Sequence, residues 1–428
     1  MYCVAKRLLC GSAALVACAV ALPYATPAQA QSGFDLVSPD TLEVTGDLRL
    51  VAVNGEKSWV NGGLGKLRSG GDGDWKLEPQ LGNANLIWQP QFTWSLGATV
   101  VGSLQGGERT EAGLSQAYLS FRPMRGAGTA FSARAGLMWP PVSLEHEGAD
   151  WHVRDSITPS AINSWIGEEV RPVAIEGTLA ANPGNHKLRA TVALFAANDT
   201  SGTLLTFRGW ALHDRTTLAF HHQPLPPLDE PVVFYQAPYT TPLLDLHDGF
   251  AHRPGYYAKL AWQPPVPVRF ALFRYDNRAD PEAVNDDLEW GWRTRFNHVG
   301  LVADLGSATT FKAQAMQGHT NMGFPVDGRR WVDNRFRAAF AMLTHGFGPV
   351  GIAVRGDAFG TRNRGSDVGD EYDDKGWSAM IAAKREWNHF TGVVELLHVS
   401  STREDREDAG LDPRQDQTQL QAEMRMHW

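Results

Sequence analysis

The sequence of 428 residues predicts an all-β fold, a closed antiparallel transmembrane β-barrel of 16–18 strands. Apolar and polar residues alternate along many segments of about ten residues, which places every second side chain on the same face of a sheet. The connections between these segments are alternately short and long, as in a barrel with tight turns at one end. One connection, residues 139–169, is too long for a turn and too apolar for a free linker. We expect it to fold into the barrel and narrow it.

Residues 1–30 are typical of a secretory signal peptide. Lys6 and Arg7 precede an apolar run over residues 8–22, and Ala28-Gln29-Ala30 forms a cleavage site of small residues. The sequence around Cys18 also resembles a lipoprotein box, so lipidation of Cys18 stays an alternative. We expect residues 31–428 to form a single outer-membrane β-barrel domain.

Composition excludes several classes of protein. All three cysteines lie within the signal peptide, and removing it leaves 37 basic against 47 acidic residues, a formal charge of −10. This balance makes nucleic acid an improbable partner. No apolar stretch of roughly 18 residues follows the signal peptide, so no membrane-spanning helix is expected.

The alternation is clearest at the two ends of the barrel domain. Between residues 42 and 52 the even positions are mainly apolar, and the odd positions include Glu43, Asp47 and Arg49. Residues 92–104 and 117–121 repeat this pattern, and residues 419–428 alternate Gln, Glu and Arg with apolar residues up to Trp428. An aromatic last residue fits the interfacial girdle of a barrel.

The number of strands depends on one region. We favour 18 strands, with Thr203 to Leu212 and Arg215 to His221 forming a hairpin; the count is 16 if this region is a loop. Long loops are expected at several places, including residues 319–333. Tryptophans near strand ends are expected in the interfacial belts, with ordinary core packing as the alternative; they are Trp59, Trp88, Trp94, Trp210, Trp262, Trp377 and Trp387.

The entry to the long connection resembles a known family. Residues 114–119 (Leu-Ser-Gln-Ala-Tyr-Leu) lead through a turn to residues 131–138, which are followed by Pro140-Pro141-Val142-Ser143-Leu144-Glu145. This order resembles the phosphate-selective porins. The resemblance implies a passive outer-membrane channel, a homotrimer, whose third extracellular loop folds inward. The chain departs from the family pattern in ending with Trp428 instead of Phe.

The face that we assign to the lumen is rich in basic residues. Fourteen bases stand against six acids, Glu43, Asp47, Glu176, Asp357, Glu395 and Glu423, which predicts a wall charge of +8 and a bias towards anions. The predicted lining bases are Arg49, Arg122, Arg134, Arg189, Arg208, Arg269, Arg293, Arg295, Arg335, Arg337, Arg355, Arg425, Lys259 and Lys312.

Residues 139–169 carry mainly acids at the expected constriction. Facing the basic wall, they would create a transverse field across the pore. Alternatively, they only anchor the loop to the wall by salt bridges. The charged residues concerned are Glu145, Glu147, Asp150, Arg154, Asp155, Glu168 and Glu169.

Other clusters are weaker. His213, His221, His222, His247 and His252 lie near one another in sequence, but their spacing matches no metal signature. The acidic run at residues 370–374 is either a solvated loop or a divalent-cation site bridging lipopolysaccharide. No Gly-Lys-Ser/Thr, Gly-x-Ser-x-Gly or His-Glu-x-x-His motif is present. We therefore expect no catalytic site, metal or cofactor.

These observations favour a porin in the outer membrane of a Gram-negative bacterium. Its expected partners are outer-membrane lipid, lipopolysaccharide and small anionic solutes such as phosphate or carboxylates. Two alternatives remain: a barrel that does not conduct and has a structural or binding role, and, less favoured, an outer-membrane lipid hydrolase.

Overall fold

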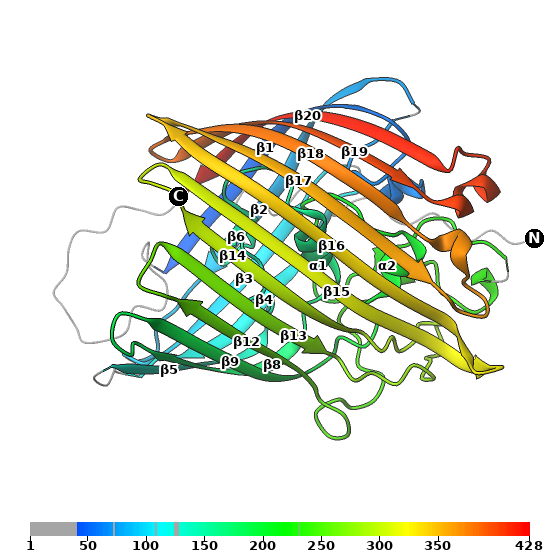
Figure 1. Cartoon of the computed structure of the whole chain (residues 1–428), viewed down its shortest axis with the longest axis horizontal. Helices are drawn as coiled ribbons and strands as arrows, with labels where there is room; N and C mark the ends of the chain where they lie inside the picture. Colours follow the sequence, from blue (N-terminus) through cyan, green and yellow to red (C-terminus); the bar gives the residue numbers. More distant parts are fainter. Residues whose placement is uncertain (1–40, 72, 108, 124–127, 231) are drawn as a thin grey trace, which may run out of the picture. The chain divides into compact units, whose positions relative to one another are not determined.

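The wall of the molecule is a closed sheet in which each strand pairs antiparallel with its neighbours (Figure 1). This computed structural model describes residues 41–71, 73–107, 109–123, 128–230 and 232–428, which belong to one compact unit, Asp35–Trp428. The expected signal peptide and Cys18 lie outside the described residues. So does part of the expected turn at residues 124–128.

Sixteen strands close the barrel in the described part of the chain. The first eight are β1 (Leu42–Asn54), β2 (Lys76–Trp88), β3 (Leu96–Gln105), β4 (Glu111–Phe121), β5 (Thr129–Leu137), β8 (Val173–Ala181), β9 (Lys187–Ala196) and β12 (Gly255–Gln263). The others are β13 (Val268–Asp276), β14 (Arg295–Asp304), β15 (Thr309–Val326), β16 (Arg329–Phe347), β17 (Val350–Asn363), β18 (Lys375–Trp387), β19 (Phe390–Thr402) and β20 (Arg414–His427). β1 pairs with β20, which closes the ring.

Short elements lie in the connections. They are η1 (Trp59–Asn61), β6 (His146–Glu147), β7 (His152–Val153), α1 (Ala161–Glu169), α2 (Thr203–Phe207), β10 (Gln223–Pro224), η2 (Val232–Phe234), β11 (Tyr239–Thr240), η3 (Asp370–Tyr372) and η4 (Glu404–Ala409). One end of the barrel has connections of two to seven residues, which we call the short-turn end. The other, the long-loop end, has the connections 55–75, 106–110, 138–172, 197–254, 277–294, 327–328, 364–374 and 403–413.

The favoured count of 18 strands is wrong. Instead of a hairpin, residues 203–221 form α2 and an irregular segment, and almost all of them are buried. Adjacent Leu204 and Leu205 break the period-two pattern there and both are buried, which a one-faced strand cannot achieve. The expected long loop at residues 319–333 is also wrong, because β15 and β16 continue to a tight turn at Asp327-Gly328. Both residues of that turn have positive φ, as an Asp-Gly hairpin turn requires.

The outer face of the wall is apolar over its middle. Leu48, Leu272, Val299 and Val354 are each about half exposed in the isolated chain, as side chains turned to lipid would be. Trp94, Trp262, Trp377 and Trp387 are also exposed near strand ends. The expectation for Trp59 and Trp210 is wrong, because both are fully buried among the connections inside the barrel.

Candidate functional site

A segment between β5 and β8, residues 138–172, enters the barrel; we call it the first lumen segment. Its helix α1 begins after Ser160, whose Oγ accepts a hydrogen bond from the Asn163 N–H. All nine residues of α1 are buried. Trp165 lies edge-on to Phe296 of β14 and Phe336 of β16, with ring centroids 5.4 and 5.2 Å apart. The helix therefore packs against the inner face of the wall.

Carboxylates of the wall hold this segment in place. Glu395 of β19 accepts hydrogen bonds from the backbone of Ile157 and Thr158, at 2.7 and 3.0 Å. Asp357 of β17 accepts one from the Ala161 N–H at 3.1 Å. The Ala161 N–H is a donor of the first turn of α1 that has no partner within the helix, and the other two bonds fix the chain that leads into it.

Most acids of the first lumen segment are themselves anchored. Glu145 lies 3.1 Å from Arg355, which also contacts Asp357 at 2.9 Å. Asp155 lies 3.0 Å from Lys312 and 3.3 Å from Lys384. Asp150 accepts a hydrogen bond from Thr45 at 3.0 Å. By contrast, Glu147 pairs with Arg154 at 3.3 Å, and both side chains are about half exposed. The anchoring interpretation thus fits most of these acids.

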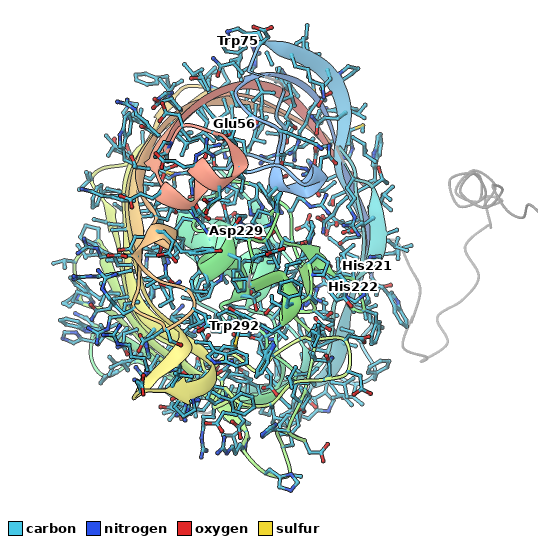
Figure 2. All side chains as sticks on the ribbon, turned by 90° about the vertical axis from the view of Figure 1, so that its right-hand side faces the viewer. Glu56, Trp75, His221, His222, Asp229 and Trp292 are labelled. Atoms are coloured by element: carbon cyan, nitrogen blue, oxygen red, sulfur yellow. The ribbon has the colours of Figure 1, made fainter. Side chains whose placement is uncertain are left out.

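Residues 197–254, between β9 and β12, also fill the interior, and we call them the second lumen segment. Arg208 contacts Glu168 of α1, with Nη2 2.8 Å from Oε2, and stacks over Trp59. The Trp210 N–H donates to Asp374, which also binds Lys66 at 3.0 Å. Seen from the long-loop end, Asp229 and Trp292 lie within the ring of strands and Trp75 lies at its edge (Figure 2). The sequence analysis missed this segment.

The two lumen segments meet at neighbouring carboxylates whose pKa values differ. Burial alone would raise the pKa of Glu168, but the contacts with Arg208 and His213 together outweigh burial and lower the pKa to about 2. His213, 3.1 Å from Glu168, has a pKa lowered by burial and is neutral at pH 7. Burial raises the pKa of Glu169 to about 7, although Leu204 N–H and Trp165 Nε1–H donate to it. Glu169 is therefore close to half protonated at neutral pH.

The long-loop end of the barrel is filled by hydrophobic packing. A cluster of buried residues joins the second lumen segment to the connections 277–294 and 364–374. Its members include Leu204, Phe207, Trp292, Val332 and Tyr372. Trp59, Val60 and Ala211 form a smaller cluster beside it. The described loops thus pack over this end of the lumen.

At the short-turn end the lumen contains a cavity of about 570 Å³. β1, β2, β18 and β20 line it together with the first lumen segment. Its charges are mixed and largely paired: Arg49 contacts Asp47, Asp214 and Glu423, each at 2.6 Å. Arg425 donates to Glu423 and to the backbone of the first lumen segment. Both arginines therefore bind the wall, and in addition Arg49 binds the second lumen segment and Arg425 the first.

A second group of bases faces the lumen across β4–β13, and we call it the basic arc: Arg122, Arg134, Arg189, Lys259 and Arg269. Register places Arg189 and Lys259 on the same face as the buried Tyr257 and Tyr275. Arg122, Arg189 and Arg269 are exposed towards the short-turn end. Arg134 is paired with Glu176 at 2.8 Å, and the Lys259 ammonium donates to the Pro141 carbonyl at 2.6 Å. The arc is thus a cationic and partly accessible side of the lumen.

Four predicted lining arginines do not face the lumen. Asp357, which binds α1, pairs with Phe340, so even positions of β16 face inward and Arg335 and Arg337 face outward. Arg295 pairs with His319, which in turn pairs with Arg335, so all three side chains lie on the outer face. Arg293, two residues before Arg295, lies on the same face. The prediction is wrong here because α1 of the first lumen segment forms an apolar core with β14 and β16. Phe296 of β14 and Phe336 and Phe340 of β16 therefore turn inward, and the arginines beside them turn outward.

The described residues contain neither a cluster of metal ligands nor a helix that could span a membrane. No group of three or more His, Cys, Asp or Glu side chains converges there, and the expected acidic run is divided, since Asp374 points inward to Lys66. Within the same part of the chain, no helix has the length and apolar character needed to cross a membrane.

Comparison with known proteins places the fold. No family model matches the sequence, and no curated protein matches it. The outer membrane channel DcaP of Acinetobacter baumannii is similar over 93% of this chain and 100% of its own, with 11% identity and a TM-score of 0.53. An anion-selective porin from Comamonas acidovorans is similar over 91% and 99%, with 10% identity and a TM-score of 0.50. The chain therefore has the fold of outer-membrane channels, a 16-stranded porin-like barrel.

Proposed function

We propose that the protein is an outer-membrane porin, a passive diffusion channel for small hydrophilic solutes that favours anions. It would act as a homotrimer in the outer membrane of a Gram-negative bacterium, after removal of residues 1–30. The basic arc is the observation that carries the anion preference. Arginine side chains on a pore wall attract anions and bind phosphate or carboxylate through two parallel hydrogen bonds.

The bases and acids of the lumen lie on different sides of it, and this separation supports the anion preference. Among the described residues, two carboxylates lie within 4 Å of a base of the basic arc: Glu176 beside Arg134 and Asp304 beside Arg269. The acids of the first lumen segment lie instead among β1, β15 and β17–β20. Charges separated across a lumen whose walls have a low dielectric constant create a transverse field, which steers a charged solute to one side.

Phosphate is the first solute to test. The region around residues 114–145 resembles phosphate-selective porins, and one channel of similar fold is described as anion-selective. Purified protein in a planar bilayer, with unequal KCl on the two sides, gives the channel and its selectivity in one recording. We expect stepwise conductance and a reversal potential of anion sign, with block by phosphate. A cation-signed potential at pH 7 would refute the anion preference, and the lack of any conductance would refute the channel.

A second candidate function is a barrel that is closed at rest and conducts only when the second lumen segment moves. The packing of this segment over the long-loop end favours it. Gln223 pairs with Thr240, so residues 224–239 can be excised between positions that already adjoin. If the barrel is closed at rest, the intact protein should show no conductance and the excised variant should conduct. An open porin should show only a moderate rise in an existing current.

A further inference from the structure

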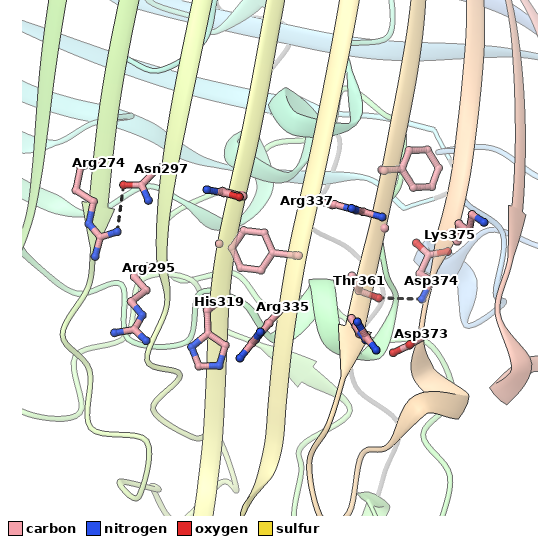
Figure 3. A pocket seen from close by; sticks show the side chains of 16 residues that line it. Arg274, Arg295, Asn297, His319, Arg335, Arg337, Thr361, Asp373, Asp374 and Lys375 are labelled. Atoms are coloured by element: carbon pink, nitrogen blue, oxygen red, sulfur yellow. Dashed lines mark hydrogen bonds between the residues drawn. The ribbon is translucent and has the colours of Figure 1, made fainter.

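The outer face of β13–β18 carries basic side chains next to the apolar band. We call Arg274, Arg295, Arg335, Arg337, Arg362 and Lys375 the outer basic patch. They line a depression of about 610 Å³ on neighbouring strands (Figure 3). Register places them in two adjacent rows, one containing Arg295, Arg335 and Arg362, the other containing the remaining three.

The position of these rows along the strands is that of a membrane interface. The next row towards the short-turn end is Leu272, Val299, Ala315, Ala339, Ala358 and Trp377. Trp377 is half exposed, as expected for an aromatic residue at the edge of the hydrocarbon. The outer basic patch begins one row beyond it, so lipid headgroups on the long-loop side would meet these side chains.

Of the six bases of this patch, only Arg274 has a carboxylate partner in the part of the chain that the structure describes, Asp276 at 4.0 Å. Among the described residues, none of the carboxylates lies within 4 Å of Arg295, Arg335, Arg337, Arg362 or Lys375. The nearby acids have closer partners: Asp333 binds His319 at 2.8 Å, and Asp373, which lines the depression together with Asp374, lies 3.5 Å from Arg364. Arg335 and Arg362 are directly paired across two strands, and like charges in that position destabilise a sheet. An anion between them would relieve this repulsion.

We propose that the outer basic patch binds the phosphate groups of a membrane lipid whose sugar headgroup carries phosphate monoesters, as in lipopolysaccharide. This rests on the proposed location in an outer membrane. The guanidinium groups of Arg335, Arg337 and Arg362 would bind phosphate through paired hydrogen bonds. The acyl chains would cover the apolar row below, and the size of the depression suits a phosphorylated sugar. A second copy of the same patch is a poor occupant, because its charge would repel.

Binding can be measured with purified protein in mixed detergent micelles containing diphosphorylated lipid A or the same lipid after enzymatic dephosphorylation. Wild-type protein should prefer the phosphorylated lipid. A triple variant Arg335→Gln, Arg337→Gln and Arg362→Gln should weaken its binding on the order of tenfold or more. The matched control is Arg122→Gln, Arg189→Gln and Arg269→Gln, which removes three charges from the lumen and should leave lipid binding unchanged.

Several outcomes would overturn the proposal. Equal binding of both lipids, equal loss in the two triple variants, or complete competition by millimolar inorganic phosphate would do so. So would intact lipid binding with a changed oligomer mass in the outer triple variant, which would make the patch an interface between copies. Bilayer conductance of the same preparations tests the porin function separately, since the outer variant should conduct as wild type does. Far-UV circular dichroism verifies that each variant is folded.

Discussion

Glu168 and Arg208 join the two lumen segments through a two-point ion pair. Arg208 Nη1 lies 2.9 Å from Glu168 Oε1, and Nη2 lies 2.8 Å from Oε2, with both side chains almost completely buried. The pair therefore links α1 to the chain after α2 without screening by water. Movement of the second lumen segment away from the first requires this contact to separate.

Glu168→Gln should loosen the two segments, because it leaves the Arg208 charge buried without its partner. Breaking one side of a buried pair costs about 3–5 kcal/mol. We expect a lower denaturant midpoint and faster proteolytic cleavage within residues 197–254. Replacing both partners by apolar residues, Glu168→Leu with Arg208→Met, should recover most of the stability, since no charge is then left unpaired. Glu147→Gln is the control, because Glu147 is about half exposed and should change stability little.

Glu169 should make stability depend on pH in the range from about 4.5 to 7. Its pKa is about 7 in the folded protein and 4.5 without burial, so the unfolded chain loses its proton first. The contribution of Glu169 to stability is therefore complete below pH 4.5 and is lost as pH rises to 7, a change of about 3 kcal/mol. Denaturant midpoints across this range should show a shallower decline for Glu169→Gln than for wild type. Parallel declines in the two proteins would refute the raised pKa.

Alternation of polarity predicted the barrel because it follows from strand geometry alone. The first and last strands lie where the pattern places them. Where β1 pairs with β20, Arg49, Glu423 and Arg425 all lie on the inner face. The inward entry of residues 139–169 was anticipated from their length and apolar content. These features follow from residues that are neighbours in the sequence, so they could be predicted without knowing the tertiary contacts.

The face that turns to the lumen could not be predicted for β14 and β16, whereas Lys312 of β15 and Arg355 of β17 face inward as predicted. Polar-in and apolar-out holds where water fills the lumen, but Phe296 and Phe336 face a hydrophobic helix there. Which face of a strand contacts water depends on the segment that packs against that strand inside the barrel. The second lumen segment was missed for the same reason, since its burial depends on contacts such as Asp374 with Trp210, 164 residues apart.

Trp165 should be the side chain of α1 that contributes most to holding the helix against the wall. Its ring contacts Trp210, Phe296 and Phe336 and is 1% exposed. Trp165→Ala removes this packing and should lower the free energy of unfolding by about 3–5 kcal/mol. Trp94→Ala is the matched control, since Trp94 is 67% exposed in the turn between β2 and β3. Urea unfolding in detergent compares them, and equal losses would contradict the assignment of Trp165 to the core.

Charge removal from the basic arc should reduce anion preference, whereas the same removal from the outer face should not. Arg189→Ala with Arg269→Ala takes two exposed charges from the lumen, while Arg335→Ala with Arg337→Ala takes two from the outer wall. A charge within a Debye length of about 8 Å acts on a permeating ion, but one behind the wall is separated from it by the sheet and the packed α1. We expect the reversal potential in unequal KCl to shift towards zero in the first variant alone. An equal shift in both variants would mean that Arg335 and Arg337 reach the conducting path, and would contradict the register that turns them outward.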